Sequence, residues 1–233
     1  MSWFVTNFVA IAVVALCVAL VLLLFVWAPI HTWRSRRALL AHLDARGFAV
    51  VRKPTKRQRQ EVYLSLAAPD LPLGSLGIRW FAIATLGERH VLMLEHLGFD
   101  RASRWFVRHL ACSAACNCAS AVTLIEPRTT SMTIRALLAG NTGPDGWSEN
   151  NCRRFRLAVS TDAQIARRLA THAAQAALSK TPDLTWVQMS SGRFCLAAPM
   201  IPTPDDGVHL LERSMKLLEA IESEVASGTE LQP

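Results

Sequence analysis

The residues best suited to chemistry in this chain are a group of thiols beside one imidazole. His109, Cys112, Cys116 and Cys118 read as His-x2-Cys-x3-Cys-x-Cys. Thiolate and imidazole are ligands that Zn²⁺ prefers, and four of them would complete a tetrahedral site. The same thiols could serve a redox reaction, or pack as small apolar side chains, as free cysteines commonly do. The spacing lacks the paired Cys-x2-Cys knuckles of known zinc modules, so it favours packing.

The element that carries this group limits its chemistry. Residues 103–112 are expected to form a strand, in which His109 and Cys112 point to opposite faces because their separation is odd. The glycines of "GNTGPDG" (140–146) lack the Gly-Lys-Ser/Thr ending of a phosphate-binding loop, and no Gly-x-Ser-x-Gly elbow is present. The sequence therefore predicts no cofactor. A thiol- or metal-dependent enzyme that uses the His109–Cys118 stretch is the alternative function.

A long apolar run precedes all of these residues. From Phe8 to Ala28 the chain has 21 consecutive residues without a charge. As a helix, at ~1.5 Å per residue, the run would be ~32 Å long, which matches a hydrocarbon core of ~30 Å. Trp27 and Trp33 lie at its end, where interfacial aromatic residues usually lie. A cleaved signal peptide would need a basic start and a shorter run. The sequence predicts an uncleaved transmembrane anchor over 1–33.

Positive charge is concentrated directly after this run. The chain has 25 basic and 18 acidic residues, a formal net charge of +7. Residues 34–61 hold nine basic and two acidic residues, so this stretch alone carries 9 − 2 = +7. A basic residue near anionic headgroups contributes about 1 kcal/mol to membrane attraction. Either the stretch fixes topology alone, or it also docks on the lipid surface through Arg34, Arg36, Arg37, Arg46, Arg52, Lys53, Lys56, Arg57 and Arg59.

The same asymmetry predicts orientation and partners. No Lys or Arg precedes the run, so the positive-inside rule places the N-terminus outside and the following domain in the cytoplasm, on the inner membrane. Five cysteines lie beyond the anchor, an odd number that suits a reducing compartment. A nucleic-acid reader would need cations on a recognition motif, which the sequence lacks. The expected partners are the bilayer, including anionic headgroups, and a protein that the sequence does not identify.

The remainder of the chain predicts an α+β domain. Short turns between neighbouring strands favour an antiparallel or mixed sheet, with helices packed on one face. We expect helices over 34–47, 55–67, 130–138, 161–180 and 205–226. We expect strands and hairpins over 48–51, 78–97, 103–112, 120–126, 154–160 and 184–198. Thr55 is the expected N-cap of its helix. The predicted organisation is an anchor (1–33), a basic juxtamembrane segment (34–61), a soluble domain (62–226) and a flexible tail (227–233).

The order of four motifs resembles a known group of proteins. "LLAHLDARGFAV" (39–50) follows the apolar run, "GER" (87–89) sits in a hairpin, and "NNCRRFRLAVSTDAQIARRL" (150–169) precedes a late "GRFCLAAP" strand (192–199). Together they resemble bacterial single-pass membrane-anchored proteins of a domain-of-unknown-function family, across most of 36–225. The chain departs from that pattern at "LEHLGF" (94–99). The resemblance implies no reaction, so the expected function is binding or assembly at the inner membrane surface.

Overall fold

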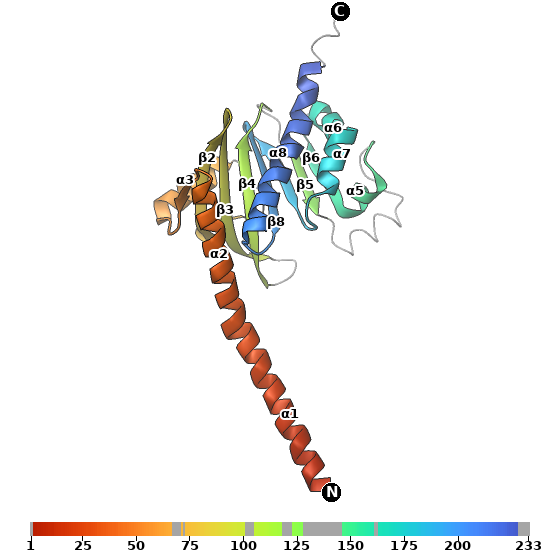
Figure 1. Cartoon of the computed structure of the whole chain (residues 1–233). Helices are drawn as coiled ribbons and strands as arrows, with labels where there is room; N and C mark the ends of the chain where they lie inside the picture. The colour runs from red at the N-terminus through yellow and green to blue at the C-terminus, as the bar shows by residue number, and fades with distance from the viewer. Residues whose placement is uncertain are drawn as a thin grey trace, which may run out of the picture.

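A computed structural model places one long N-terminal helix on an α+β domain (Figure 1). The structure describes residues 2–66, 71, 73–100, 105–117, 123–127, 146–160 and 163–227. Every strand pairing in it is antiparallel. The predicted α+β class is confirmed, and the sheet is antiparallel rather than mixed.

The sheet has eight strands in the order β1-β2-β3-β4-β8-β7-β5-β6. Their bounds are Ala49–Val51 (β1), Ile78–Leu86 (β2), Arg89–Asp100 (β3), Trp105–Ala115 (β4), Thr123–Pro127 (β5), Phe155–Ser160 (β6), Trp186–Ser190 (β7) and Arg193–Pro199 (β8). Gly87 and Gly192 adopt positive φ angles in the β2–β3 and β7–β8 turns, a conformation that glycine allows at little cost. Both predicted hairpins are confirmed. The strand β8 pairs with β4 on one side and with β7 on the other. It thereby joins β1–β4 and β5–β7 into one sheet.

Helices cover both faces of this sheet. Their bounds are Ser2–Leu22 (α1), Ala28–Ala45 (α2), Lys56–Leu66 (α3), Glu149–Arg154 (α5), Ala163–Leu169 (α6), His172–Ser179 (α7) and Pro204–Ser227 (α8), with a π-helical turn at Leu23–Trp27 and a 3-10 turn at Ser75–Gly77. One core lies under α2 and α6–α8 and includes Trp80 and Leu218. The other lies under α3 and joins Val62 and Leu66 to Phe81. The expectation of helices on one face is wrong, because the central strands are apolar on both sides.

The N-terminal helix is continuous from α1 through the π-helical turn into α2. Pro29 lies in the first turn of α2, where a missing N–H is tolerated. Over Phe8–Ala45 the helix is long and apolar enough to cross a membrane: an 18-residue window has a mean hydropathy of 3.4, and none of that window is buried within the protein. The apolar run is therefore not a core helix of this domain.

The second half of this helix belongs to the domain. Leu39, Leu40 and Leu43 are buried, which confirms the predicted apolar stripe. The helix ends before Gly47, whose φ is +84°, and β1 then pairs with the edge of β2. The charge-based boundary between 34–61 and 62–226 is therefore not a boundary of the fold.

The last third differs from the sequence prediction at one break. The helix expected over 161–180 is two helices, α6 and α7, because Thr171 is extended and its Oγ1 accepts a hydrogen bond from the Ala174 N–H. In α7 the buried residues are Ala174, Gln175 and Leu178. Thr55 caps α3 as expected, through a bond from the Gln58 N–H. The short helix α5 was not predicted, and the helix expected over 130–138 lies outside the described residues.

The packing of α2 on the domain predicts the effect of truncating Leu39. This side chain is fully buried, and its Cδ1 lies 2.4 Å from where a Cβ on Gly207 of α8 would be. We expect Leu39→Ala to lower the free energy of unfolding by about 2–5 kcal/mol. Leu64→Ala, at a side chain that is 65% exposed, should change it by less than about 0.5 kcal/mol. Chemical unfolding of the full-length protein in detergent measures both, and equal stabilities would contradict this packing.

Candidate functional site

The thiol and imidazole group does not assemble into one site. His109 lies on one face of β4, with its ring centroid 6.4 Å from that of His96. Cys112 lies on the other face, in the core under α8. The prediction of opposite faces is confirmed, so His109 and Cys112 cannot bind the same ion. Cys116 is ~13 Å further along the chain from Cys112, and Cys118 is outside the described residues. The four-ligand zinc site is thereby excluded.

The environment of Cys112 also counts against thiol chemistry. Burial raises the pKa of its thiol to about 12, and a hydrogen bond with Ser214 offsets this only in part. Burial raises the pKa of Cys195 as well. A nucleophilic or metal-binding cysteine acts as the thiolate, which these two side chains do not form at neutral pH. Cys112 therefore packs as a small apolar side chain.

The nine basic residues predicted to bind the membrane surface separate into two groups. Seven have exposed side chains: Arg34, Arg37, Arg46, Arg52, Lys53, Lys56 and Arg57. Of these, Arg37 lies over the Trp33 ring and Arg57 pairs with Glu61. Arg59 is partly buried. Arg36 turns into the protein instead and pairs with Glu95, so it has a structural role.

The exposed cations after β1 lie at about the same height along the sheet as the start of the buried part of α2. The helix α2 carries the chain away from the apolar run, and β1 returns toward it, antiparallel to β2. Val51 at the end of β1 lies opposite Phe81, the neighbour of Trp80. Arg52 and Lys53 therefore follow at about the level where Arg36 enters the domain, whereas Arg46 lies at the far end of α2.

Arg36 is part of a buried ionic group that we call the Glu95 cluster: Arg36, Trp80, Glu95 and Arg108. The Glu95 side chain is 0% exposed, and both arginines are 28% exposed. Arg36 binds the carboxylate with two hydrogen bonds, from Nε at 2.6 Å and from Nη2 at 2.7 Å. The Trp80 indole donates to the same carboxylate at 2.6 Å. Such a bidentate pair with a further donor is the arrangement in which a buried carboxylate is tolerated.

Strand register positions these side chains. Trp80 of β2 lies directly opposite Glu95 of β3, and Arg108 of β4 lies opposite Leu97, diagonally adjacent on the same face. The Arg108 Nε is 2.9 Å from the carboxylate, but its N–H does not point at that oxygen, so the contact is an ion pair without a hydrogen bond. Burial lowers the pKa of Arg108, and repulsion by Arg36 and Arg79 lowers it further against the attraction of Glu95.

One feature of the sequence could have indicated this cluster: a single charged residue inside an apolar strand. Glu95 is the lone charge in the apolar run "VLMLEHL" (91–97). Because a strand covered on both faces has no solvent for a carboxylate, that charge requires buried partners. Its main partner, Arg36, is 59 residues away, so spacing could not identify it.

His96 follows Glu95 and therefore lies on the opposite face. The Gly74 N–H donates to its Nε2 at 2.8 Å. A Cβ at Gly77 would lie 2.2 Å from that nitrogen, and a Cβ at Gly98 would lie 2.4 Å from Cε1, so the ring fills a space that only glycines leave. Burial, followed by the nearby His109, lowers the pKa of His96 to about 4. The ring is neutral at pH 7 and holds the loop before β2.

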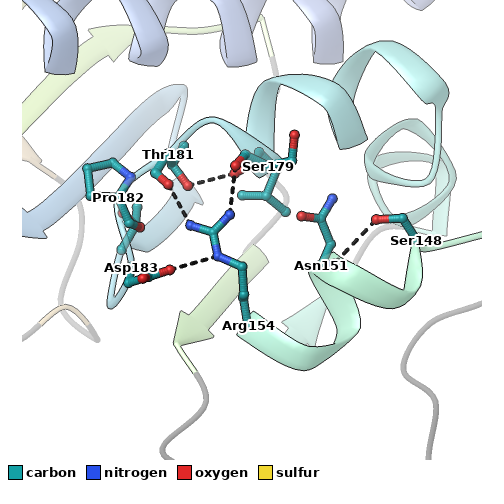
Figure 2. A network of polar contacts seen from close by, with 9 residues as sticks. Ser148, Asn151, Arg154, Ser179, Thr181, Pro182 and Asp183 are labelled. Carbon is teal, nitrogen blue, oxygen red and sulfur yellow. Dashed lines mark hydrogen bonds and ion pairs between the residues drawn. The ribbon is translucent and has the colours of Figure 1, made fainter.

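A second polar network joins the short helices of the far half (Figure 2). Arg154 donates to the Ser179 carbonyl at 2.7 Å and the Thr181 carbonyl at 2.5 Å, and pairs with Asp183. These carbonyls end α7, where a cation is favourable. The Asn151 side chain donates to the Gln175 backbone and side chain, which ties α5 to α7. These bonds join α5, α7 and the segment after α7 to one another, so the role that they indicate is structural.

The Glu95 cluster predicts a large effect of removing its one negative charge. Glu95→Gln leaves two partly buried guanidinium groups uncompensated, so we expect the free energy of unfolding to fall by about 3–5 kcal/mol. Glu61→Gln is the matched control: it breaks an exposed pair with Arg57 and should change the free energy by less than about 1 kcal/mol. Denaturant unfolding of the full-length protein compares them, and equal midpoints would argue against a buried cluster.

His96 predicts a pH dependence of stability. Its pKa of about 4 in the folded protein lies below the value of about 6.5 in an unfolded chain. Between these values the unfolded chain binds a proton that the folded one does not, so stability falls as the pH is lowered from 6.5 toward 4. The largest slope is about 1.4 kcal/mol per pH unit.

Two variants isolate this effect. His96→Gln keeps an acceptor for the Gly74 N–H and should flatten the slope in unfolding curves taken across that pH window. His172→Gln, at an exposed position, should keep it. An unchanged slope in His96→Gln would assign the pH dependence to other groups.

Comparisons with known proteins give one likeness, in fold. No family model matches the chain, and no curated protein matches its sequence. Among solved structures, the crystal structure of the mycobacterial trehalose monomycolate transport factor A, TtfA, is similar, with a TM-score of 0.52 over 79% of this chain and 93% of that chain. The sequence identity is 10%, so the likeness concerns the α+β fold alone.

Proposed function

We propose that this protein is a single-pass inner-membrane protein that holds a cytoplasmic α+β domain in a fixed orientation for binding or assembly at the membrane surface. The observation that carries the proposal is one unbroken helix with two roles. Its first part is apolar and unburied, and its second part lies in the core of the domain. A helix shared in this way couples the two parts without a linker.

Rigid coupling suits assembly better than tethering. Arg36 follows Ala28 by eight residues, or ~12 Å of helix, and it is already bound to Glu95. A tether that only raises local concentration works through a flexible linker. A domain clamped directly on its anchor instead presents the same surface to every neighbour in the membrane. That property favours a docking partner that is itself in or on the bilayer.

The charge pattern supports the orientation. Arg34 and Arg37 are exposed directly after the apolar run, and no basic residue precedes it. Cytoplasmic flanks carry this excess. We propose the role of a non-catalytic component of a membrane assembly. TtfA, which is similar in fold, is named a transport factor. The buried, protonated Cys112 favours this class over a thiol-dependent enzyme.

Reporter fusions test the proposed orientation. Green fluorescent protein at the C-terminus should fluoresce in the membrane fraction, whereas alkaline phosphatase at the same position should be inactive, because the former works in the cytoplasm and the latter outside it. Replacing Arg34 and Arg37 with Gln should produce a mixture of orientations. The matched control, Arg153→Gln with Arg167→Gln, removes two exposed cations from the far half of the domain and should not. An active phosphatase on the wild-type chain would overturn the proposal.

A further inference from the structure

We infer that the open side of the Glu95 cluster binds the phosphate group of an anionic lipid in the adjacent leaflet. The inference rests on the proposed membrane attachment and names a ligand for it. The observation that supports it is an imbalance of charge. Arg36 and Arg108 both contact the single carboxylate of Glu95. Two cations therefore face one anion within the cluster, which leaves a net charge of +1.

The donors of the cluster are only partly used. A guanidinium group has five N–H donors. Arg36 spends its Nε and one Nη2 hydrogen on Glu95, and Arg108 makes no hydrogen bond to it. Within the described part of the chain, Arg36 bonds to Glu95 through Nε and Nη2, and the Nε of Arg108 has no hydrogen-bond partner. Each arginine side chain is 28% exposed, so part of each side chain is open to a ligand from solvent.

The carboxylate holds the two arginines in place for such a ligand. Arg36 is fixed by its bidentate bond, and Glu95 is itself fixed by the Trp80 indole. The side chains therefore lose little conformational freedom when an anion arrives, and binding is favoured accordingly. Paired guanidinium groups match the geometry of a phosphate better than ammonium groups do.

The position of the cluster favours a lipid as the source of the phosphate. The helix α2 enters the domain beside the end of the sheet that lies toward the anchor (Figure 1). Arg108 lies opposite Leu97, two residues or ~7 Å beyond Glu95 along β3, on the side of the β3–β4 connection. Arg36 is ~12 Å of helix beyond Ala28. With a headgroup layer of roughly 5–8 Å on each leaflet, an arginine side chain directed toward the bilayer reaches its phosphates.

Lipid retention by the full-length protein tests the inference. The protein is reconstituted into nanodiscs of phosphatidylcholine mixed with phosphatidylglycerol, and native mass spectrometry records the lipids that stay bound on release. We expect wild type to retain phosphatidylglycerol and Arg108→Gln to retain about tenfold less, the loss of one charge-assisted contact. The matched control Arg153→Gln removes an exposed cation of α5 and should behave as wild type. Equal retention by Arg108→Gln would overturn the inference.

A second measurement uses the wild-type protein alone, so it does not depend on how a variant folds. Phenylglyoxal modifies accessible arginines, and its rate at Arg108 should be several-fold lower in discs that contain phosphatidylglycerol than in discs of phosphatidylcholine alone. Equal rates would overturn the inference. Protection by inorganic phosphate in phosphatidylcholine discs, to the level given by phosphatidylglycerol, would overturn the lipid as occupant. A chain that fails to insert into discs refutes the proposed function itself, whereas insertion with equal rates refutes only the ligand.

Discussion

Burial of the Glu95 carboxylate is the constraint on which the arrangement of this protein depends. Removing a carboxylate from water is unfavourable by several kcal/mol unless cations and N–H donors surround it. Here the compensating groups come from three elements, Arg36 of α2, Trp80 of β2 and Arg108 of β4. Because α2 continues into the apolar helix, neutralising this one charge also sets the direction in which that helix leaves the domain.

The helix α8 connects α2 to the rest of the sheet. The helix α8 starts against α2, where Gly207 leaves room for Leu39. It ends where Glu222 pairs with Arg89 of the β2–β3 hairpin and accepts the Asn117 backbone N–H. Between these ends α8 packs on the core that joins both halves of the sheet. The helix α8 is therefore packed against the entering helix at one end and paired with the β2–β3 hairpin at the other.

The polar groups of the two faces have different uses. Under the helices, the charges of the Glu95 cluster join α2 to β3 and β4, with two guanidinium groups against one carboxylate. On the other face, neutral His96 fills a gap between Gly77 and Gly98 and holds the loop before β2. Burial keeps His96 neutral at pH 7, and the backbone around the ring decides its position. These groups support the fold, and burial keeps the thiols of Cys112 and Cys195 protonated at neutral pH.

Local signals in the sequence determined the apolar helix, the two hairpins around Gly87 and Gly192, the Thr55 cap and the stripe of Leu39, Leu40 and Leu43, because each depends on neighbours within a few residues. Tertiary structure alone decided that β8 lies between β4 and β7, that α6 and α7 part at Thr171, and that α3 covers the second face. It also selected Arg36 among nine similar cations as the partner of Glu95. Arg36 and Glu95 are 59 positions apart in the sequence. They meet because of the register of β2, β3 and β4 and the direction in which α2 crosses them.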